Sequence, residues 1–187
     1  MRLPLTSLPQ AILFLLICCL PGGATILEKL STERLIDEST EIVRGTVNYC
    51  SPIYKAPVIY TVCEIAVSER FKGLEAARVM VMVPGGTALG LRQNYAAAPI
   101  LERGKEHVFF IWQGKSGNKQ LMGLCQGLMN LAKDSRGNVL VLRSKVDERM
   151  VNAKGEAVED HGFHMALNQL RETVQARGAG KTTGARQ

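Results

Sequence analysis

An alternating stripe of apolar side chains in the middle of the chain is the feature that most constrains its fold. Within residues 58–70, apolar or β-branched residues occupy every second position from Ile59 to Val67. A period of two residues is typical of a long β-strand with one buried face. The residues expected to share the buried face are Ile59, Thr61, Cys63, Ile65 and Val67.

Further segments of the same kind surround this strand and are separated by turns rich in glycine and proline. Residues around Ser51, Pro52 and Pro57 are expected to form the turn before it. Other strands are expected at 41–47, 78–83, 107–112, 120–132 with an interruption at Gly127, and 139–142, followed by a small hairpin over 150–158. Many short strands joined in this way favour a mainly β fold, a closed or nearly closed antiparallel barrel.

Each end of this β region has a helix signal. Ser31 is a predicted N-cap for a short helix near residues 30–36. From Phe163 onward the period changes, and Phe163, Leu167, Leu170 and Val174 recur at helical spacing. The prediction is therefore a β-barrel with a short N-terminal helix and a C-terminal helix.

The first residues are typical of a secretory signal peptide. Arg2 provides positive charge, residues 11–20 form an apolar run, and Pro21–Ala24 supplies a helix-breaking exit with small residues. We expect cleavage after Ala24; an uncleaved anchor is the alternative, although a membrane-spanning helix needs about 20 apolar residues. The predicted organisation is a signal peptide (1–24), one domain (25–177) and a flexible tail (178–187), with no stable membrane span after processing.

Charge and cysteine content agree with an exported, periplasmic or secreted protein. The formal charge of +6 becomes +5 without the leader, because Arg2 is the only charged residue before Glu28. Mild basicity favours weak attraction to anionic surfaces. Aromatic and basic residues do not alternate in the way that would indicate nucleic-acid binding. After processing, Cys50, Cys63 and Cys125 remain. Cys50 and Cys63 flank a predicted hairpin and are candidates for a disulfide; the alternative is that all three are buried without a bridge.

Five short motifs occur in a fixed order between residues 30 and 177. They are Glu41–Val47 (EIVRGTV), Val67–Gly73 (VSERFKG), Val83–Gly86 (VPGG), Gly104–Glu106 (GKE) and Gly123–Gly127 (GLCQG). This order resembles a group of exported bacterial proteins of unknown function that look like small barrels of the OB or netrin type. The resemblance implies an OB-like barrel but no reaction, ligand or partner. Lys105 within GKE and Cys125 within GLCQG depart from the group's pattern.

Three motifs suggest chemistry but have simpler interpretations. Residues 178–183 (GAGKTT) imitate the end of a phosphate-binding loop, yet the required earlier glycine, preceding strand and following helix are missing. Asp160, His161 and His164 are weak metal-ligand candidates, and a polar loop before the last helix is the preferred interpretation. His107 begins an apolar strand and is expected to be structural. We expect no cofactor and no catalytic residue.

The segment from Pro84 to Arg103 has no persistent period and is long for a connection. It is expected to be either a functional or a poorly ordered loop, and Arg92, Gln93, Asn94 and Tyr95 are its candidate binding residues. The leading hypothesis is a non-enzymatic exported binding or interaction module of unknown ligand, for which a protein and an envelope polymer are the candidate partners. The alternatives are a metal-dependent or other hydrolase using His107, His161 and His164, and a structural component of the cell envelope.

Overall fold

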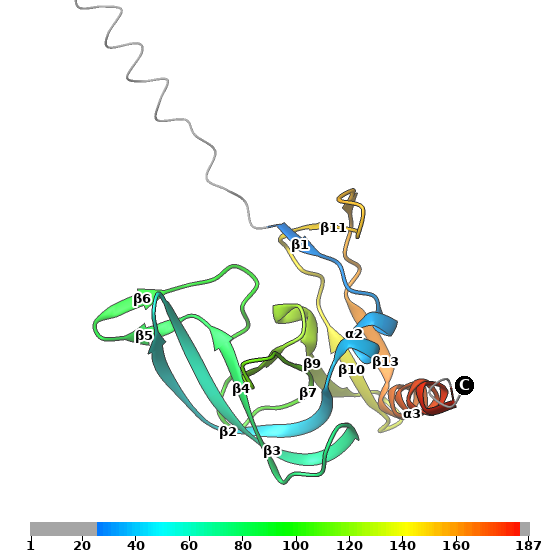
Figure 1. Ribbon diagram of the computed structural model, residues 1–187. Coiled ribbons are helices and arrows are strands. Elements are labelled where there is room, and N and C mark those ends of the chain that lie inside the picture. The colour runs from blue at the N-terminus through cyan, green and yellow to red at the C-terminus, as the bar shows by residue number, and fades with distance from the viewer. Residues whose placement is uncertain (1–25, 184–187) are drawn as a thin grey trace, which may run out of the picture.

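The computed structural model describes residues 26–183, and the predicted signal peptide and its cleavage site lie outside this range. About half of the described chain is strand, with one helix near each end (Figure 1). In chain order the elements are β1 (Ile26–Glu28), α2 (Thr32–Glu38), β2 (Glu41–Lys55), β3 (Val58–Lys72), β4 (Arg78–Pro84), β5 (Gly86–Ala88), β6 (Leu91–Gln93), β7 (Glu106–Gln113), β8 (Lys119–Leu121), the 3-10 helix η1 (Leu124–Gly127), β9 (Leu128–Lys133), β10 (Val139–Arg143), β11 (Arg149–Val151), β12 (Ala157–Val158), β13 (Phe163–Ala166) and α3 (Leu167–Thr183). The mainly β prediction with two helices is confirmed.

The central sheet has the order β13-β10-β9-β7-β2-β3-β4-β8. Its backbone is the long β2–β3 hairpin, in which Cys50 lies directly opposite Cys63. β8 pairs with two strands: antiparallel to β7 over three residues and parallel to β4 through Met82 and Gln120. The small β5–β6 hairpin and the set β1-β11-β12 form two separate sheets.

The alternating stripe of β3 faces one of two apolar clusters. Ile59, Cys63 and Ile65 are completely buried, as their spacing predicts. The cluster that contains the last two also draws side chains from β2, β4, β7 and β8; its buried members are Val43, Val47, Cys63, Ile65, Val79, Val81, Val83, Phe109, Ile111 and Leu121. These strands therefore share one interior, and apolar burial is its main stabilising contribution.

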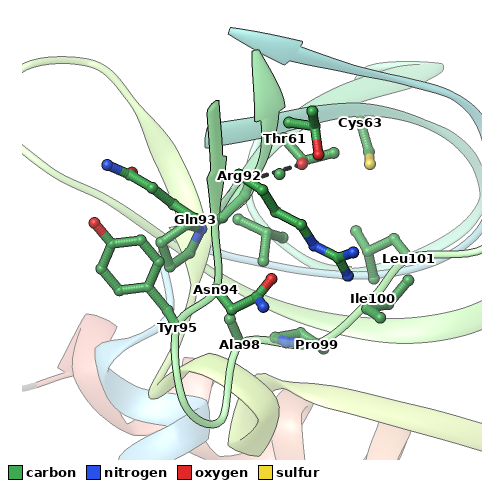
Figure 2. A pocket seen from close by; sticks show the side chains of 15 residues that line it. Thr61, Cys63, Arg92, Gln93, Asn94, Tyr95, Ala98, Pro99, Ile100 and Leu101 are labelled. Atoms are coloured by element: carbon green, nitrogen blue, oxygen red, sulfur yellow. Dashed lines mark hydrogen bonds between the residues drawn. The ribbon is translucent and has the colours of Figure 1, made fainter. Parts of the chain in front are cut away.

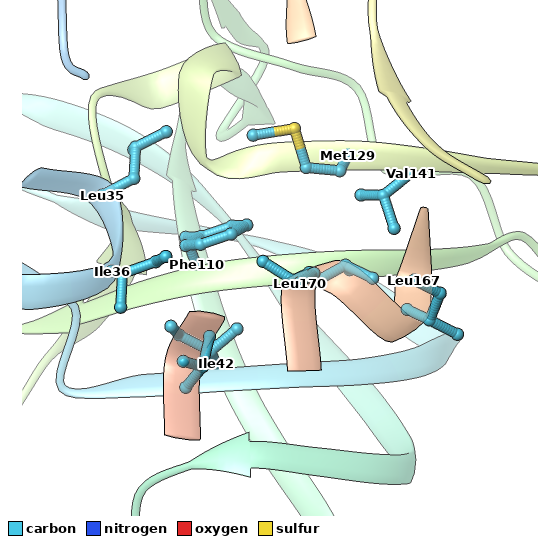
Figure 3. Close-up of a cluster of buried hydrophobic side chains, with 10 residues drawn as sticks. Leu35, Ile36, Ile42, Phe110, Met129, Val141, Leu167 and Leu170 are labelled. Carbon is cyan, nitrogen blue, oxygen red and sulfur yellow. The ribbon is translucent and has the colours of Figure 1, made fainter. Parts of the chain in front are cut away.

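A second cluster joins the two helices to the sheet (Figure 3). Leu35 and Ile36 of α2 and Leu170 and Val174 of α3 pack against Phe110 and its neighbours on β7, β9 and β10. Ser31 caps α2 by accepting a hydrogen bond from the Arg34 amide at 3.2 Å, so the predicted N-cap is confirmed. The helices thus cover one side of the sheet and leave the β4–β6 side to the connecting loops.

A buried glutamine holds the N-terminal segment against η1. Gln126 is 1 % exposed. Its Oε1 accepts from the Leu30 amide at 2.9 Å, and its Nε2 donates to the Glu28 carbonyl at 2.9 Å. Both polar ends of the side chain are satisfied by backbone groups, which is the condition for burying an amide without a large desolvation cost.

Three charged side chains meet where β3 ends. Arg70 donates to Glu41 at 2.7 Å and to the Ala76 carbonyl, and Lys119 of β8 pairs with the other oxygen of Glu41. The side chains of Arg70 and Glu41 are 4 % and 9 % exposed. Burial raises the pKa of Glu41, but the hydrogen bonds and charges of Lys119 and Arg70 outweigh it and lower the pKa overall. This cluster occupies the end of β3 farthest from Thr61.

Three boundaries differ from the sequence prediction. β2 continues through Ser51 and Pro52 to Lys55, because β7 pairs with β2 only as far as Thr46 and leaves Pro52 on an unpaired edge where its missing N–H is tolerated. Residues 163–166 form β13 instead of the first helical turn, because they pair with β10. α3 extends past Arg177 to Thr183; residues 184–187 of the predicted tail lie outside the described residues.

Candidate functional site

The Pro84–Gly86 turn attaches the start of the long connection to β3. The Gly85 amide donates to the Ile59 carbonyl and the Thr61 hydroxyl donates to the Gly85 carbonyl, both at 2.8 Å. Gly86 has φ +133°, and a Cβ atom there would lie 2.7 Å from Thr61 Oγ1. Only glycine combines this backbone conformation with this close approach. The predicted turn is therefore also one wall of a site.

The β5–β6 hairpin is fixed in place by Gln93. Its Oε1 accepts from the Ile59 amide at 2.7 Å and its Nε2 donates to the Pro57 carbonyl at 3.0 Å. These bonds connect the hairpin to the turn between β2 and β3. Both ends of the Gln93 amide are occupied by the protein itself, so its role is to position the hairpin rather than to contact a ligand.

The second half of the connection, residues 94–101, is attached on its far side. The Ala97 amide donates to Glu148 Oε1 at 2.9 Å, and the Ala97 carbonyl accepts from the Cys125 amide at 3.0 Å. Ala98 and Leu101 pack against the apolar cluster of the strands. The connection is an ordered part of the fold, so the alternative of a poorly ordered loop is not what the structure shows.

Between these two halves lies a cavity of about 500 Å³. Arg92, Gln93, Asn94 and Tyr95, the four residues expected to bind, all line it. The remaining wall residues are Thr61, Cys63, Val83, Pro84, Gly85, Gly86, Thr87, Ala98, Pro99, Ile100 and Leu101. The cavity is therefore mainly apolar, with a few polar groups, which is the usual composition of a small-ligand site.

Arg92 is the charged group of this cavity. Its side chain extends from β6 toward Ile100 and Leu101, while Gln93 and Tyr95 lie on the other side of the strand (Figure 2). Among residues 26–183, Arg92 forms none of the ion pairs of the structure. A guanidinium beside apolar walls suits a carboxylate, sulfonate or phosphate attached to an apolar body.

Cys50 and Cys63 form a disulfide that links β2 and β3 next to the cavity. Cys125 is free and half-buried, and burial raises the pKa of its thiol. A raised pKa keeps the thiol protonated at neutral pH, and a protonated thiol is a poor nucleophile. The disulfide forms part of the site, whereas Cys125 has no chemical role that this environment supports.

The sheet separates His107 from the other candidate ligands, whereas Asp160 and His161 are neighbours that line one surface pocket. Asp160 receives hydrogen bonds from Arg143 at 2.6 and 3.1 Å and from the Val146 amide at 2.8 Å. Burial raises the pKa of Asp160, but these bonds outweigh it and lower the pKa to about 2. His164 lies on β13, and β9 and β10 separate it from His107 on β7. No group of three potential ligand side chains within residues 26–183 is positioned to hold a metal ion.

His107 has a structural environment. Burial lowers the pKa of this imidazole, and its ring contacts Phe109 edge-on with centroids 5.8 Å apart. In the described part of the chain, its Nδ1 has no hydrogen-bond partner. A neutral, packed imidazole of this kind fits the interpretation as a structural histidine better than a role as a ligand or base.

The sequence predicted the lining residues Arg92–Tyr95 but not the opposite wall of the cavity. Thr61, Cys63 and Val83 belong to strands whose alternation predicts only that they face inward. Nothing in their spacing indicates that one end of this interior is open. The anchoring bond from Ala97 to Glu148, 51 residues away, carries no local sequence signal.

No known family model and no curated protein matches this chain. Within residues 26–183, none of the helices is both long and apolar enough to cross a membrane.

Proposed function

We propose that the protein is an exported, non-enzymatic binding module that takes its ligand into the cavity between the β5–β6 hairpin and residues 94–101. The observation that carries this proposal is the placement of Arg92, which forms no ion pair within residues 26–183, in a cavity of about 500 Å³ with apolar and polar walls. The ligand class is an amphipathic molecule or chain segment with one acidic group.

The fold that presents this cavity is proposed to be an OB-like barrel made of β2, β3, β4, β8 and β7. Support comes from β8, which pairs with both β4 and β7 and so connects the two outer strands of this set. The resemblance of the five sequence motifs to exported proteins with OB or netrin-type barrels points the same way. In a small barrel the mouth and its loops are the usual binding region.

Export is proposed from the leader-like residues 1–24 and is supported by the Cys50–Cys63 disulfide. Disulfides persist in oxidising compartments and are rare in the cytosol. Expression of the full chain followed by mass spectrometry of the periplasmic or secreted fraction tests this part. Recovery of a chain that begins at Thr25 is the expected result; full-length protein in the cytosol would contradict it.

The binding proposal is tested with 1-anilinonaphthalene-8-sulfonate, a fluorescent probe with an apolar body and one sulfonate. We expect saturable binding that weakens about tenfold in Arg92→Gln, because a charge-assisted hydrogen bond is worth about 1.5–3 kcal/mol. Arg136→Gln, in the exposed turn between β9 and β10, is the matched control. Absence of binding, or equal affinity in the two variants, would overturn the proposal, and near-ultraviolet circular dichroism checks that both are folded.

A further inference from the structure

The tip of the β5–β6 hairpin carries leucines that no part of residues 26–183 covers. Leu89 is 79 % exposed and Leu91 is 58 % exposed. The tip itself stands clear of the molecule, since a Cβ atom added at Gly90 would have no atom within 4 Å. Neither leucine lines the cavity. An exposed apolar side chain is common, but two at one projecting tip mark an interaction surface.

The backbone at the tip disfavours the residue that occupies it. Ala88 pairs with Leu91, so Leu89 and Gly90 are the two central residues of the turn, with φ +53° and +75°. Two-residue hairpin turns with positive φ at both positions strongly prefer Asn-Gly or Asp-Gly. A bulky leucine in the left-handed region is an outlier that costs stability. Packing within the protein does not account for Leu89, because its side chain is exposed.

The segments of chain on either side of the tip contain basic residues but no acidic ones. Residues 42–63 and 76–101 contain no aspartate or glutamate. Arg92 lies on the same hairpin as the leucines, and Lys55 is at the end of β2, beside the turn to which Gln93 attaches the hairpin. The chain as a whole carries +6. An apolar tip with positive charge around it is complementary to a surface that is negative outside and apolar inside.

We propose that the β5–β6 tip is a docking site for an anionic lipid surface, into which Leu89 and Leu91 insert. A lipid surface is favoured over a protein partner because the tip is convex and narrow. A stable protein interface buries about 800 Å² on each partner with complementary shape, which two leucines at a turn do not supply. Insertion into lipid requires only apolar side chains and nearby positive charge.

The test measures binding of the chain 25–187 to lipid vesicles by co-sedimentation. This form contains every described residue and lacks the apolar run of residues 11–20, which would bind vesicles by itself. The vesicles contain equal amounts of phosphatidylcholine and phosphatidylglycerol, and vesicles of phosphatidylcholine alone provide the comparison. We expect binding to the anionic vesicles and at least tenfold weaker binding to the neutral ones.

Leu89→Asn is the decisive variant, because asparagine suits a left-handed turn position and the fold is retained. Leu74→Asn is the matched control: Leu74 is 88 % exposed and lies in the β3–β4 turn, at the other end of β3. Loss of the Leu89 contact is expected to weaken vesicle binding about tenfold, whereas Leu74→Asn binds like the unmodified chain.

Three results would overturn the proposal. They are no binding of the unmodified chain to anionic vesicles, equal binding by Leu89→Asn and Leu74→Asn, and self-association or binding to another protein that depends on Leu89 without vesicle binding. Probe binding in the cavity is measured on the same variants. Because Leu89 does not line the cavity, loss of vesicle binding with normal probe affinity separates this proposal from the proposed function.

Discussion

Gln126 and Leu30 are 96 residues apart in the sequence, yet the Leu30 amide donates to the Gln126 side chain at 2.9 Å. The same side chain donates to the Glu28 carbonyl. This arrangement explains the glutamine of the GLCQG motif as a clamp on the segment that joins β1 to α2. It has no connection to the cavity, and its contribution is to stability.

Replacement of Gln126 by alanine is expected to lower the free energy of unfolding by about 2–4 kcal/mol, because two backbone groups lose their partner and a buried side chain leaves a void. Urea denaturation followed by circular dichroism measures the change. Gln113→Ala removes an exposed glutamine that bonds only to Gly117 and is expected to cost less than 1 kcal/mol. Similar losses in the two variants would contradict the clamp.

The Asp160–Arg143 pair is expected to make stability depend on acid pH. The pKa of Asp160 falls from 3.8 to about 2 in the folded protein. A carboxyl group with a lowered folded pKa stabilises the fold above its unfolded pKa, and this contribution disappears as pH falls from about 4 to about 2. The shift corresponds to about 2 kcal/mol.

Urea denaturation of the wild type and of Asp160→Asn between pH 7 and pH 2 measures this contribution. Asp160→Asn is expected to have a lower free energy of unfolding than the wild type at pH 7. This difference between the two proteins is expected to narrow by about 2 kcal/mol toward pH 2. Asp147→Asn is the surface control. A difference that stays constant over this pH range would refute the assignment to Asp160.

Removal of the Cys50–Cys63 disulfide is expected to destabilise the protein through its unfolded state. The bridge closes a loop with a sequence separation of 13 residues. Such a loop contributes about 3 kcal/mol in the chain-entropy treatment. The double variant Cys50→Ala/Cys63→Ala should lose about this amount in urea denaturation. In Cys125→Ala the Cys50–Cys63 disulfide remains, so reduction with dithiothreitol should still lower the stability of this variant. A Cys125→Ala variant whose stability does not change on reduction would show that a different pair is bridged.

Leu89→Asn is expected to stabilise the isolated protein while it weakens vesicle binding. Asparagine is favoured over leucine at this backbone conformation by roughly 0.5–1 kcal/mol. Thermal and urea denaturation of the chain 25–187 measure the change without lipid. A clear loss of stability would mean that Leu89 has a packing role, which its exposure argues against.

Strands could be predicted from the sequence where every second side chain is buried. The stripe of β3 extends from Val58 almost to the end of the strand, and Ile59, Cys63 and Ile65 are buried as expected. The β11–β12 hairpin and the N-cap at Ser31 were also predictable, because turn and cap residues act locally. These features need no knowledge of distant partners.

Features that depend on distant pairing were not predictable. The helical spacing from Phe163 is real from Leu167 onward, but β10 recruits Phe163–Ala166 into the sheet. The extension of β2 past Pro52 depends on its pairing with β3, and Pro52 is tolerated because the pairing with β7 stops at Thr46, opposite the first residue of β7. In the same way, the sequence indicated Arg92–Tyr95 as a candidate contact region but contained no signal for the wall supplied by Thr61, Cys63 and Val83.

The ordered motifs describe the scaffold rather than its ligand. A Cβ atom at Gly45 of EIVRGTV would lie 2.4 Å from the Ala66 carbonyl, so the close approach of β2 and β3 requires glycine. Structural contacts likewise account for Gly86 of VPGG and Gln126 of GLCQG. In the proposed function, recognition is assigned to Arg92 and its neighbours, which lie between the motifs.

The Arg70–Glu41–Lys119 cluster has a consequence for the evolution of specificity. Arg70 and Lys119 both pair with the Glu41 carboxylate where β3 ends, so that end of the strands is occupied by an ion cluster. Access to the cavity beside Cys63 is from the side on which Arg92 and Leu101 lie. In the proposed function, exchange of residues 87–101 alone would change the specificity, while the charge cluster at the opposite end of the strands is kept.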